Sequence, residues 1–158
     1  MRTLGWLPLL MMAAPVLAQQ AVAPAAKPAP ASKPVVMERL IFDGQPSDYA
    51  GGWARIVGLK KNGDGFVSVR AAPSTDATEV DRLTLNRNVY AINPADDWKK
   101  ATFIGVIYHP DPNADAEKFE AACGVENPPR ADAPVKREYT GPCKSGWVHK
   151  RFVEVLAD

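Results

Sequence analysis

Acidic and amide side chains in the C-terminal half of the chain have the spacing of a calcium-binding loop. Asp111, Asn113 and Asp115 follow the pattern D-x-N-x-D, in which side-chain oxygens coordinate the ion. The sixth position of such a loop requires glycine, and the twelfth requires a bidentate glutamate. Here those positions are Ala116 and Ala122. We therefore predict no calcium site, and interpret these residues as a turn that leads into a helix cap.

Paired carboxylates are a second candidate for chemistry. Asp96 and Asp97 adjoin Trp98, but neighbouring residues in a turn cannot face each other across a substrate, as glycoside hydrolysis requires. The sequence also lacks Gly-x-Ser-x-Gly, His-Glu-x-x-His and phosphate-binding glycine motifs. We predict that the protein is not an enzyme and has no catalytic residue and no cofactor. A small wall-modifying enzyme with an unfamiliar active site is the weakest alternative.

The chain has two cysteines, Cys123 and Cys143. A bond between them would close a loop of about 20 residues, which in the chain-entropy model stabilises a fold by roughly 3 kcal/mol. A metal site would need His109 and His149 as well, and no C-x-x-C or H-x-x-x-H spacing supports one. We predict a disulfide and no metal site.

Aromatic side chains suggest binding rather than catalysis. Seven of them lie on or beside predicted strands: Trp53, Phe66, Tyr90, Trp98, Phe103, Tyr108 and Trp147. A small barrel can bury about half of these, and the rest would form an exposed aromatic groove. We assign Trp53 and Phe66 to the core, and predict that Tyr90, Trp98 and Tyr108 line the groove. The alternative, in which all are core residues, remains open.

These aromatic residues belong to short β-rich segments separated by turns. Strands are predicted over residues 53–57, 66–70, 79–83, 89–93 and 98–108, with shorter ones at 146–148 and 152–156. Gly105 is a candidate bulge. These five strands and two shorter segments, with little helix, indicate a mainly β protein, either a small barrel or a sandwich.

For two of the predicted strands, the sequence also predicts which residues lie on the same face. In the strand at 53–57, Trp53 and Val57 should share one face. In the strand at 79–83, Val80 and Leu83 should point inward. Residues 109–142 interrupt the β pattern and hold many proline and glycine residues, with a short helix over residues 116–122.

The N-terminal part of the chain is predicted to lie outside the fold. Residues 1–18 have a charged start, an apolar run and small residues at a cleavage site, which is typical of a secretory signal peptide. Residues 19–36 are rich in alanine and proline, and are predicted to be an extended linker. An alternative is that Lys33-Pro34 belongs to a proline-rich ligand for this protein's own domain. The domain is predicted to span residues 37–158.

Charge argues against some partners. The full chain has 19 Lys and Arg against 18 Asp and Glu, and removal of residues 1–18 removes only Arg2, which leaves 18 of each. A neutral protein is not attracted broadly to nucleic acid or to anionic lipid. We therefore predict no nucleic-acid partner and no membrane insertion after signal cleavage.

Several motifs in order along the chain resemble a bacterial SH3 (Src homology 3, or SH3b-like) domain. They are residues 66–70 followed by Pro73-Ser74, residues 80–83, residues 89–92, Asp97-Trp98, and residues 146–149. The segments 123–125 and 141–147 resemble an exported proteobacterial subset of such domains with a Cys-stapled insertion. The resemblance implies a small five-stranded, partly open barrel with an irregular disulfide-stapled insertion at about residues 109–142. It also implies that residues 146–148 form the last sheet strand before a short turn at residues 150–152.

The resemblance implies a binding function. Related domains bind cell-wall peptides or glycans, usually without catalysis. We predict an exported, periplasmic or secreted binding module for peptidoglycan or an envelope protein, acting through the groove at Tyr90, Trp98 and Tyr108. The alternative is a structural or inhibitory accessory protein that docks on a partner enzyme through the stapled insertion at residues 109–142.

Overall fold

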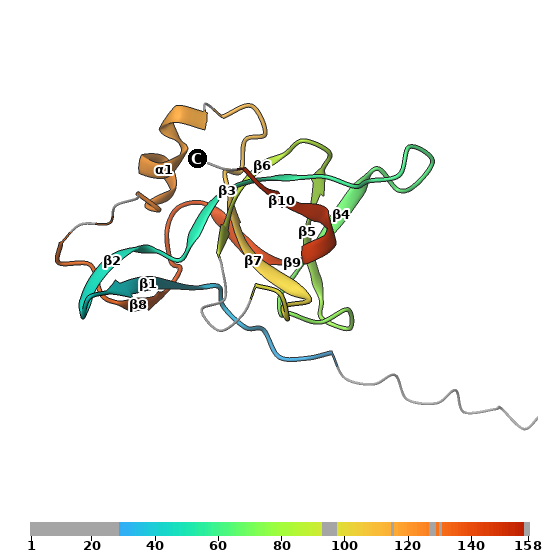
Figure 1. Cartoon of the computed structure of the whole chain (residues 1–158). Coiled ribbons are helices and arrows are strands. Elements are labelled where there is room, and N and C mark those ends of the chain that lie inside the picture. The colour runs from blue at the N-terminus through green and yellow to red at the C-terminus, as the bar shows by residue number, and fades with distance from the viewer. Residues whose placement is uncertain (1–28, 93–97, 115, 127–128, 130, 157–158) are drawn as a thin grey trace, which may run out of the picture.

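The computed structural model describes residues 29–92, 98–114, 116–126, 129 and 131–156. Within these residues the chain forms two antiparallel sheets of three and seven strands, with one short α-helix (Figure 1). The predicted mainly β class is confirmed, and the expected number of strands was too low. The signal peptide, predicted for residues 1–18, lies outside the described residues.

The larger sheet contains most of the predicted strands. Across the sheet they are β10 (Val153–Val155), β3 (Gly51–Ile56), β6 (Asn88–Ile92), β7 (Phe103–Tyr108), β9 (Lys144–His149), β4 (Phe66–Arg70) and β5 (Glu79–Thr84). A 3₁₀ turn, η1 (Lys150–Phe152), joins β9 to β10. No pairing between the outer strands β10 and β5 closes this sheet into a barrel in the described part of the chain.

The smaller sheet begins with a hairpin that the sequence analysis did not identify. Strand β1 (Val36–Phe42) pairs with β2 (Gln45–Tyr49) on one side and with β8 (Lys136–Glu138) on the other. The turn residues Asp43 and Gly44 have φ values of 48° and 76°. Two consecutive positive φ angles match the twist of a two-residue hairpin.

One buried arginine ties this hairpin to the insertion. Arg39 on β1 is only 9% exposed, and its guanidinium donates to the carbonyl oxygens of Ser47 and Pro46 at 2.7 and 3.0 Å. A third bond, at 3.1 Å, reaches the carbonyl of Ala133 in the insertion. Burial of a cation is costly unless its donors are satisfied, so these carbonyls fix the base of the hairpin.

The larger sheet is covered on both faces. The first core cluster lies on one face and consists of Ala54, Ile56, Val67, Val69, Leu83, Val89, Ala91, Ile104, Val106, Tyr108, Val148 and Val153. The second core cluster lies on the other face and joins the sheet to the hairpin and the helix; it consists of Val35, Met37, Tyr49, Tyr90, Ile92, Ile107, Phe119, Cys123, Val125 and Tyr139. Successive residues of β6 therefore point to opposite faces and are buried on both.

The helix α1 (Ala116–Cys123) covers the second face of the sheet. The rings of Phe119 and Trp53 lie 4.9 Å apart, and the indole of Trp53 donates to Glu120 Oε1 at 2.9 Å. The predicted helix at residues 116–122 agrees with these bounds to within one residue. The capping role assigned to Asp115 falls outside the described residues.

The predicted disulfide between Cys123 and Cys143 is confirmed, with the two Cα atoms 5.1 Å apart. The hydroxyl of Tyr139 donates to the carbonyl of Cys123 at 2.8 Å and accepts from the amide of Cys143 at 3.1 Å. The disulfide attaches the insertion to the start of β9. It also indicates an oxidising, extracytoplasmic environment. No helix in the described ranges is long and apolar enough to span a membrane.

Contacts of the fold begin inside the segment that was predicted to be linker. The amide of Lys33 donates to the carbonyl of Ala71 at 2.8 Å, and the indole of Trp147 donates to the carbonyl of Lys33 at 2.6 Å. Val35 is 2% exposed. A Cβ at Gly105 would lie 2.9 Å from Val35 Cγ1, so Gly105 allows this segment to approach the sheet. Gly105 pairs in regular register and is not a bulge.

The histidine that ends β9 should make stability depend on pH. His149 Nδ1 accepts from the amide of Arg151 at 3.3 Å, and its ring lies 5.4 Å from that of Phe103. Burial, and then the positive charge of Arg151, lower the pKa of His149 below its usual 6.5. The unfolded chain therefore binds the proton more readily than the folded protein does. The free energy of unfolding decreases as the pH falls below about 6.5, the usual pKa of histidine.

We expect the melting temperature to fall between pH 7.5 and pH 5, and the fall to be smaller in His149→Gln. Thermal denaturation of both proteins across this range checks the prediction. An equal pH dependence in the two proteins would assign the effect to other groups.

Candidate functional site

The structure separates the three residues that were predicted to share a groove. Tyr90 is 1% exposed and belongs to the second core cluster, whereas Tyr108 is 2% exposed and belongs to the first. Neither ring is available to an exposed groove. The physical reason is that both faces of β6 and β7 are covered, which leaves no solvent-facing side for alternate residues of these strands.

Trp98 is the one member of the predicted groove that is not fully buried, and it lines a cavity. It is half-buried, packs against the first core cluster, and borders a cavity of about 370 Å³. Lys150 holds this region in place, since its ammonium donates to the carbonyl of Trp98 at 2.6 Å and lies 5.8 Å from the indole centroid. The other residues that line the cavity are Leu40, Tyr49, Ala50, Gly51, Gly52, Ala91 and Val155. We call this the Trp98 cavity.

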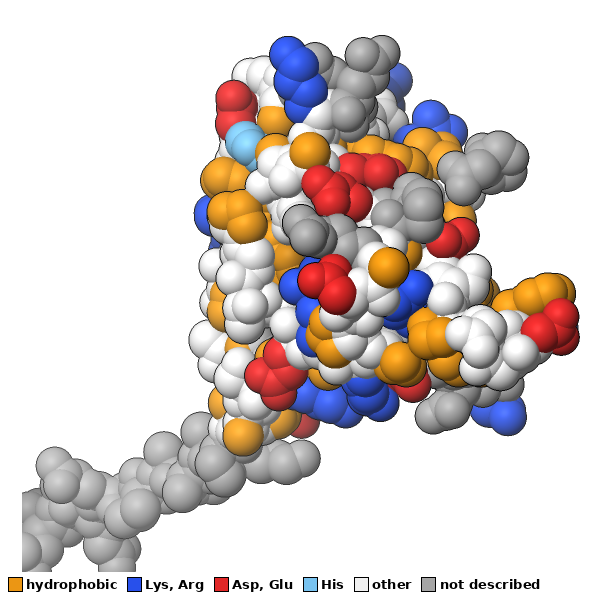
Figure 2. Space-filling view, turned by 90° about the vertical axis from the view of Figure 1, so that its left-hand side faces the viewer, with side chains coloured by type: hydrophobic (Ala, Val, Ile, Leu, Met, Phe, Trp, Pro, Cys, Tyr) orange, Lys and Arg blue, Asp and Glu red, His pale blue; other side chains and the backbone are white. Residues whose placement is uncertain are grey.

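The Trp98 cavity is apolar and lies at the base of the hairpin. Tyr49 lines it with a polar group, and its hydroxyl accepts a hydrogen bond from Arg137 Nε at 3.1 Å. Leu40 connects the cavity with the outer hairpin, where Leu40, Ile41 and Phe42 are 52%, 57% and 73% exposed. On this side of the molecule, hydrophobic side chains are interspersed with charged ones (Figure 2). The arrangement suits an apolar side chain of a ligand.

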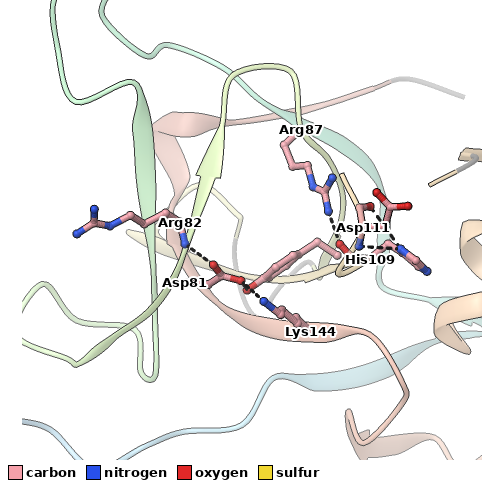
Figure 3. Close-up of polar contacts among 7 residues, drawn as sticks. Asp81, Arg82, Arg87, His109, Asp111 and Lys144 are labelled. Atoms are coloured by element: carbon pink, nitrogen blue, oxygen red, sulfur yellow. Dashed lines mark hydrogen bonds and ion pairs between the residues drawn. The ribbon is translucent and has the colours of Figure 1, made fainter. Parts of the chain in front are cut away.

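A second cavity, of about 240 Å³, is polar (Figure 3). Its centre is Asp81 on β5, which accepts from Lys144 Nζ at 2.8 Å and from the hydroxyl of Tyr108 at 3.1 Å. Burial alone would raise the pKa of Asp81, but the bonds from Lys144, the amide of Arg82 and Tyr108 lower it overall. Burial and the charge of Asp81 raise the pKa of Tyr108, so this hydroxyl stays protonated and donates. We call this the Asp81 cleft.

The loop after β7 forms one edge of the Asp81 cleft. Arg87 donates to the carbonyl of His109, and the amide of Asp111 donates to His109 Nδ1 at 3.1 Å. Asp111 Oδ1 accepts from the amide of Asn113 at 2.9 Å, as in an Asx turn. These bonds explain the local D-x-N pattern as a turn, and no group of three metal-ligating side chains occurs in the described ranges.

Sequence reasoning named one residue of each cavity, Trp98 and Tyr108, but placed them in one groove and did not identify the Asp81 cleft. The cleft residues Asp81, Arg87, Tyr108 and Lys144 come from four segments, and no local spacing connects them. Comparison with protein-family models, with curated proteins and with solved structures found no match to this chain. The functional argument therefore depends on the two cavities and their chemistry.

Proposed function

We propose that this chain is an exported, non-enzymatic binding module of the bacterial SH3 type that binds an envelope protein in the periplasm. The observation that carries the proposal is the Trp98 cavity and its continuity, through Leu40, with the exposed apolar end of the hairpin. Three consecutive exposed apolar side chains beside an apolar cavity are typical of a site that binds another protein. The disulfide supports an extracytoplasmic location.

The SH3-type assignment is supported by the position of the motif residues in the fold. The motif at residues 66–70 forms β4, residues 146–149 lie on β9, and a 3₁₀ turn follows at Lys150–Phe152, where a short turn was expected. The sheet has more strands than the five of a simple SH3-type barrel. The additional hairpin and β8 form a separate sheet, which provides part of the proposed binding surface.

The chemistry of the Trp98 cavity favours a protein partner over a glycan of the cell wall. Sugar hydroxyls require hydrogen-bonding side chains around an aromatic platform, because unpaired polar groups are costly to bury. Among the described residues, the lining of this cavity consists of Tyr49, alanine, glycine, leucine, valine and the indole of Trp98. An apolar side chain from a partner protein fits this lining better than a sugar does.

Site-specific photocrosslinking in the periplasm tests the proposal. A benzophenone amino acid at position 42 should give a defined adduct with a protein, because Phe42 is 73% exposed beside the cavity. The matched control is the same probe at Val80, which is 53% exposed on β5. Trp98→Ala in the position-42 background should reduce the adduct about tenfold or more, as expected when a central aromatic contact of about 2 kcal/mol is removed.

Two other results would contradict this function. Trp98-dependent co-sedimentation of the mature protein with purified peptidoglycan sacculi would favour wall binding instead. An adduct only from a probe at Val135, which is 41% exposed in the insertion, would favour docking through the stapled insertion. Thermal melting of Trp98→Ala must show a folded protein before either loss is interpreted.

A further inference from the structure

Arg87 occupies an unusual position at the edge of the Asp81 cleft. The residue is half-buried at the turn between β5 and β6, and its guanidinium donates to the carbonyl of His109. Among the described residues this is the one hydrogen bond of the Arg87 side chain, and no carboxylate lies within ion-pair distance of it. Arginine has five N–H donors in a planar fork, so most of the donors of Arg87 have no acceptor on the described protein.

The other charges that line the Asp81 cleft are already paired. Lys144 and Asp81 form an ion pair at 2.8 Å, and Arg82 forms one with Glu79 at 2.5 Å. Burial lowers the pKa of Arg87, while the negative charges of Asp111 and Asp81 act in the opposite direction. These carboxylates moderate the positive potential of the cleft and do not neutralise Arg87 by direct contact.

We propose that the Asp81 cleft binds the carboxylate group of a peptide, with Arg87 as the ligand-binding residue, while Lys144 stays paired with Asp81. A guanidinium fork matches the two oxygens of a carboxylate and forms two parallel hydrogen bonds. The hydroxyl of Thr84 is a further lining donor. This site is distinct from the Trp98 cavity, since the two cavities have no described lining residue in common.

The lining selects a monoanion attached to a small apolar group. A phosphate dianion would meet the negative charges of Asp81 and Asp111 near Arg87, so a single carboxylate is better accommodated. Leu83, Pro110 and Pro112 provide apolar walls beside the cations. Together these features favour a peptide carboxylate, from either a C-terminus or an acidic side chain.

Nuclear magnetic resonance titration of the mature protein tests this inference. The probes are N-acetyl-alanyl-alanine, the same dipeptide as its C-terminal amide, N-acetylglutamate α-amide, and inorganic phosphate, all at constant ionic strength. We expect the two carboxylates to shift the Nε–Hε signal of Arg87 with saturation, and the dipeptide amide to have no such effect. The carboxylate that binds more tightly shows whether the cleft recognises a peptide C-terminus or an acidic side chain.

Variants of residues in the cleft distinguish specific binding of a carboxylate by Arg87 from general electrostatic attraction. Arg87→Gln should weaken carboxylate binding about tenfold or more, because it removes charge-assisted hydrogen bonds, and Arg87→Lys should weaken it less. Arg82→Gln is the matched control, since Arg82 already pairs with Glu79, and it should change binding little.

Several results would overturn the inference. They are equal binding of the acid and the amide, tighter binding of phosphate than of either carboxylate, unchanged binding in Arg87→Gln, or equal shifts with sodium chloride alone. If Arg87→Gln fails to fold, the Arg87 signal of the wild-type protein and the variant Arg87→Lys decide the question. Because the Trp98 cavity is not involved, failure here leaves the photocrosslinking result independent.

Discussion

Replacing Tyr90 by alanine is expected to reduce the free energy of unfolding by about 3–5 kcal/mol, the range for removal of a large buried aromatic side chain. The ring is 1% exposed and lies in the second core cluster, between the sheet and the elements that cover it. It also packs against the backbone of β3, because a Cβ at Gly51 would lie 2.7 Å from Tyr90 Cε1. The cavity left by alanine could not close without movement of both layers.

Equilibrium urea denaturation of Tyr90→Ala, Tyr90→Phe and Trp98→Ala tests this assignment. Tyr90→Phe keeps the ring and should retain most of the stability. Trp98→Ala should reduce the free energy of unfolding less than Tyr90→Ala does, since Trp98 is only half-buried and already faces a cavity. A stable Tyr90→Ala protein that had lost binding of a partner would instead restore Tyr90 to the exposed groove first predicted for it.

The sequence was most informative where local pattern and local chemistry agreed. Strands at residues 66–70 and 89–92 and the helix near residue 116 depend on neighbours along the chain. The disulfide could be predicted because the chain has only two cysteines. The assignment of faces was less successful. Val80 and Leu83 are three residues apart, so in a strand they point to opposite sides, and Val80 is 53% exposed while Leu83 is 4% exposed.

The prediction that Trp53 on β3 is a core residue holds only in part, because this residue packs against the second core cluster and not the first. Ala54 and Ile56 point into the first core cluster, whereas Trp53 is half-buried on the opposite face beneath α1. A sheet that is covered on both faces buries both sets of alternate residues, and the largest side chain then does not mark the principal core. Phe66, also predicted to be a core residue, is half-buried beneath Arg82, whose guanidinium lies 4.2 Å from the ring centroid.

The sequence contains a turn motif that could have predicted the hairpin beside the Trp98 cavity. Asp43-Gly44 is a strong two-residue hairpin turn, but the flanking residues 40–42 are continuously apolar and show no alternation. In the structure the tip of the hairpin projects, and these apolar residues are exposed. The cavity itself could not be predicted, because its lining comes from β1, the β2–β3 corner, β6 and β10, which only the tertiary fold brings together.

Removal of the disulfide should have the second large effect on stability. Replacement of both Cys123 and Cys143 by serine is expected to cost about 3 kcal/mol, the value for release of a loop of about 20 residues. The melting temperature should fall by roughly 10 °C. Cys123 is fully buried in the second core cluster, so a serine hydroxyl at this position adds a desolvation cost.

The loss of stability should appear in the insertion before it appears in the whole domain. The hydroxyl of Tyr139 bridges the two cysteine backbones, and β8 precedes this residue directly. Without the covalent bond, α1 and β8 should exchange their amide hydrogens faster than β7 and β9 do, because only the insertion loses its attachment to the sheet.

Hydrogen exchange and thermal melting of the double-serine variant check both parts of this prediction, with the reduced and alkylated wild-type protein as a second measurement. Ala122→Ser is the matched control, since it places a serine on an exposed position of the same helix and should leave the melting temperature almost unchanged. An unaltered melting temperature in the double-serine variant would mean that packing of Phe119 and Tyr139 alone holds the insertion to the sheet. Faster exchange throughout the larger sheet would show that the insertion and the sheet unfold as one cooperative unit.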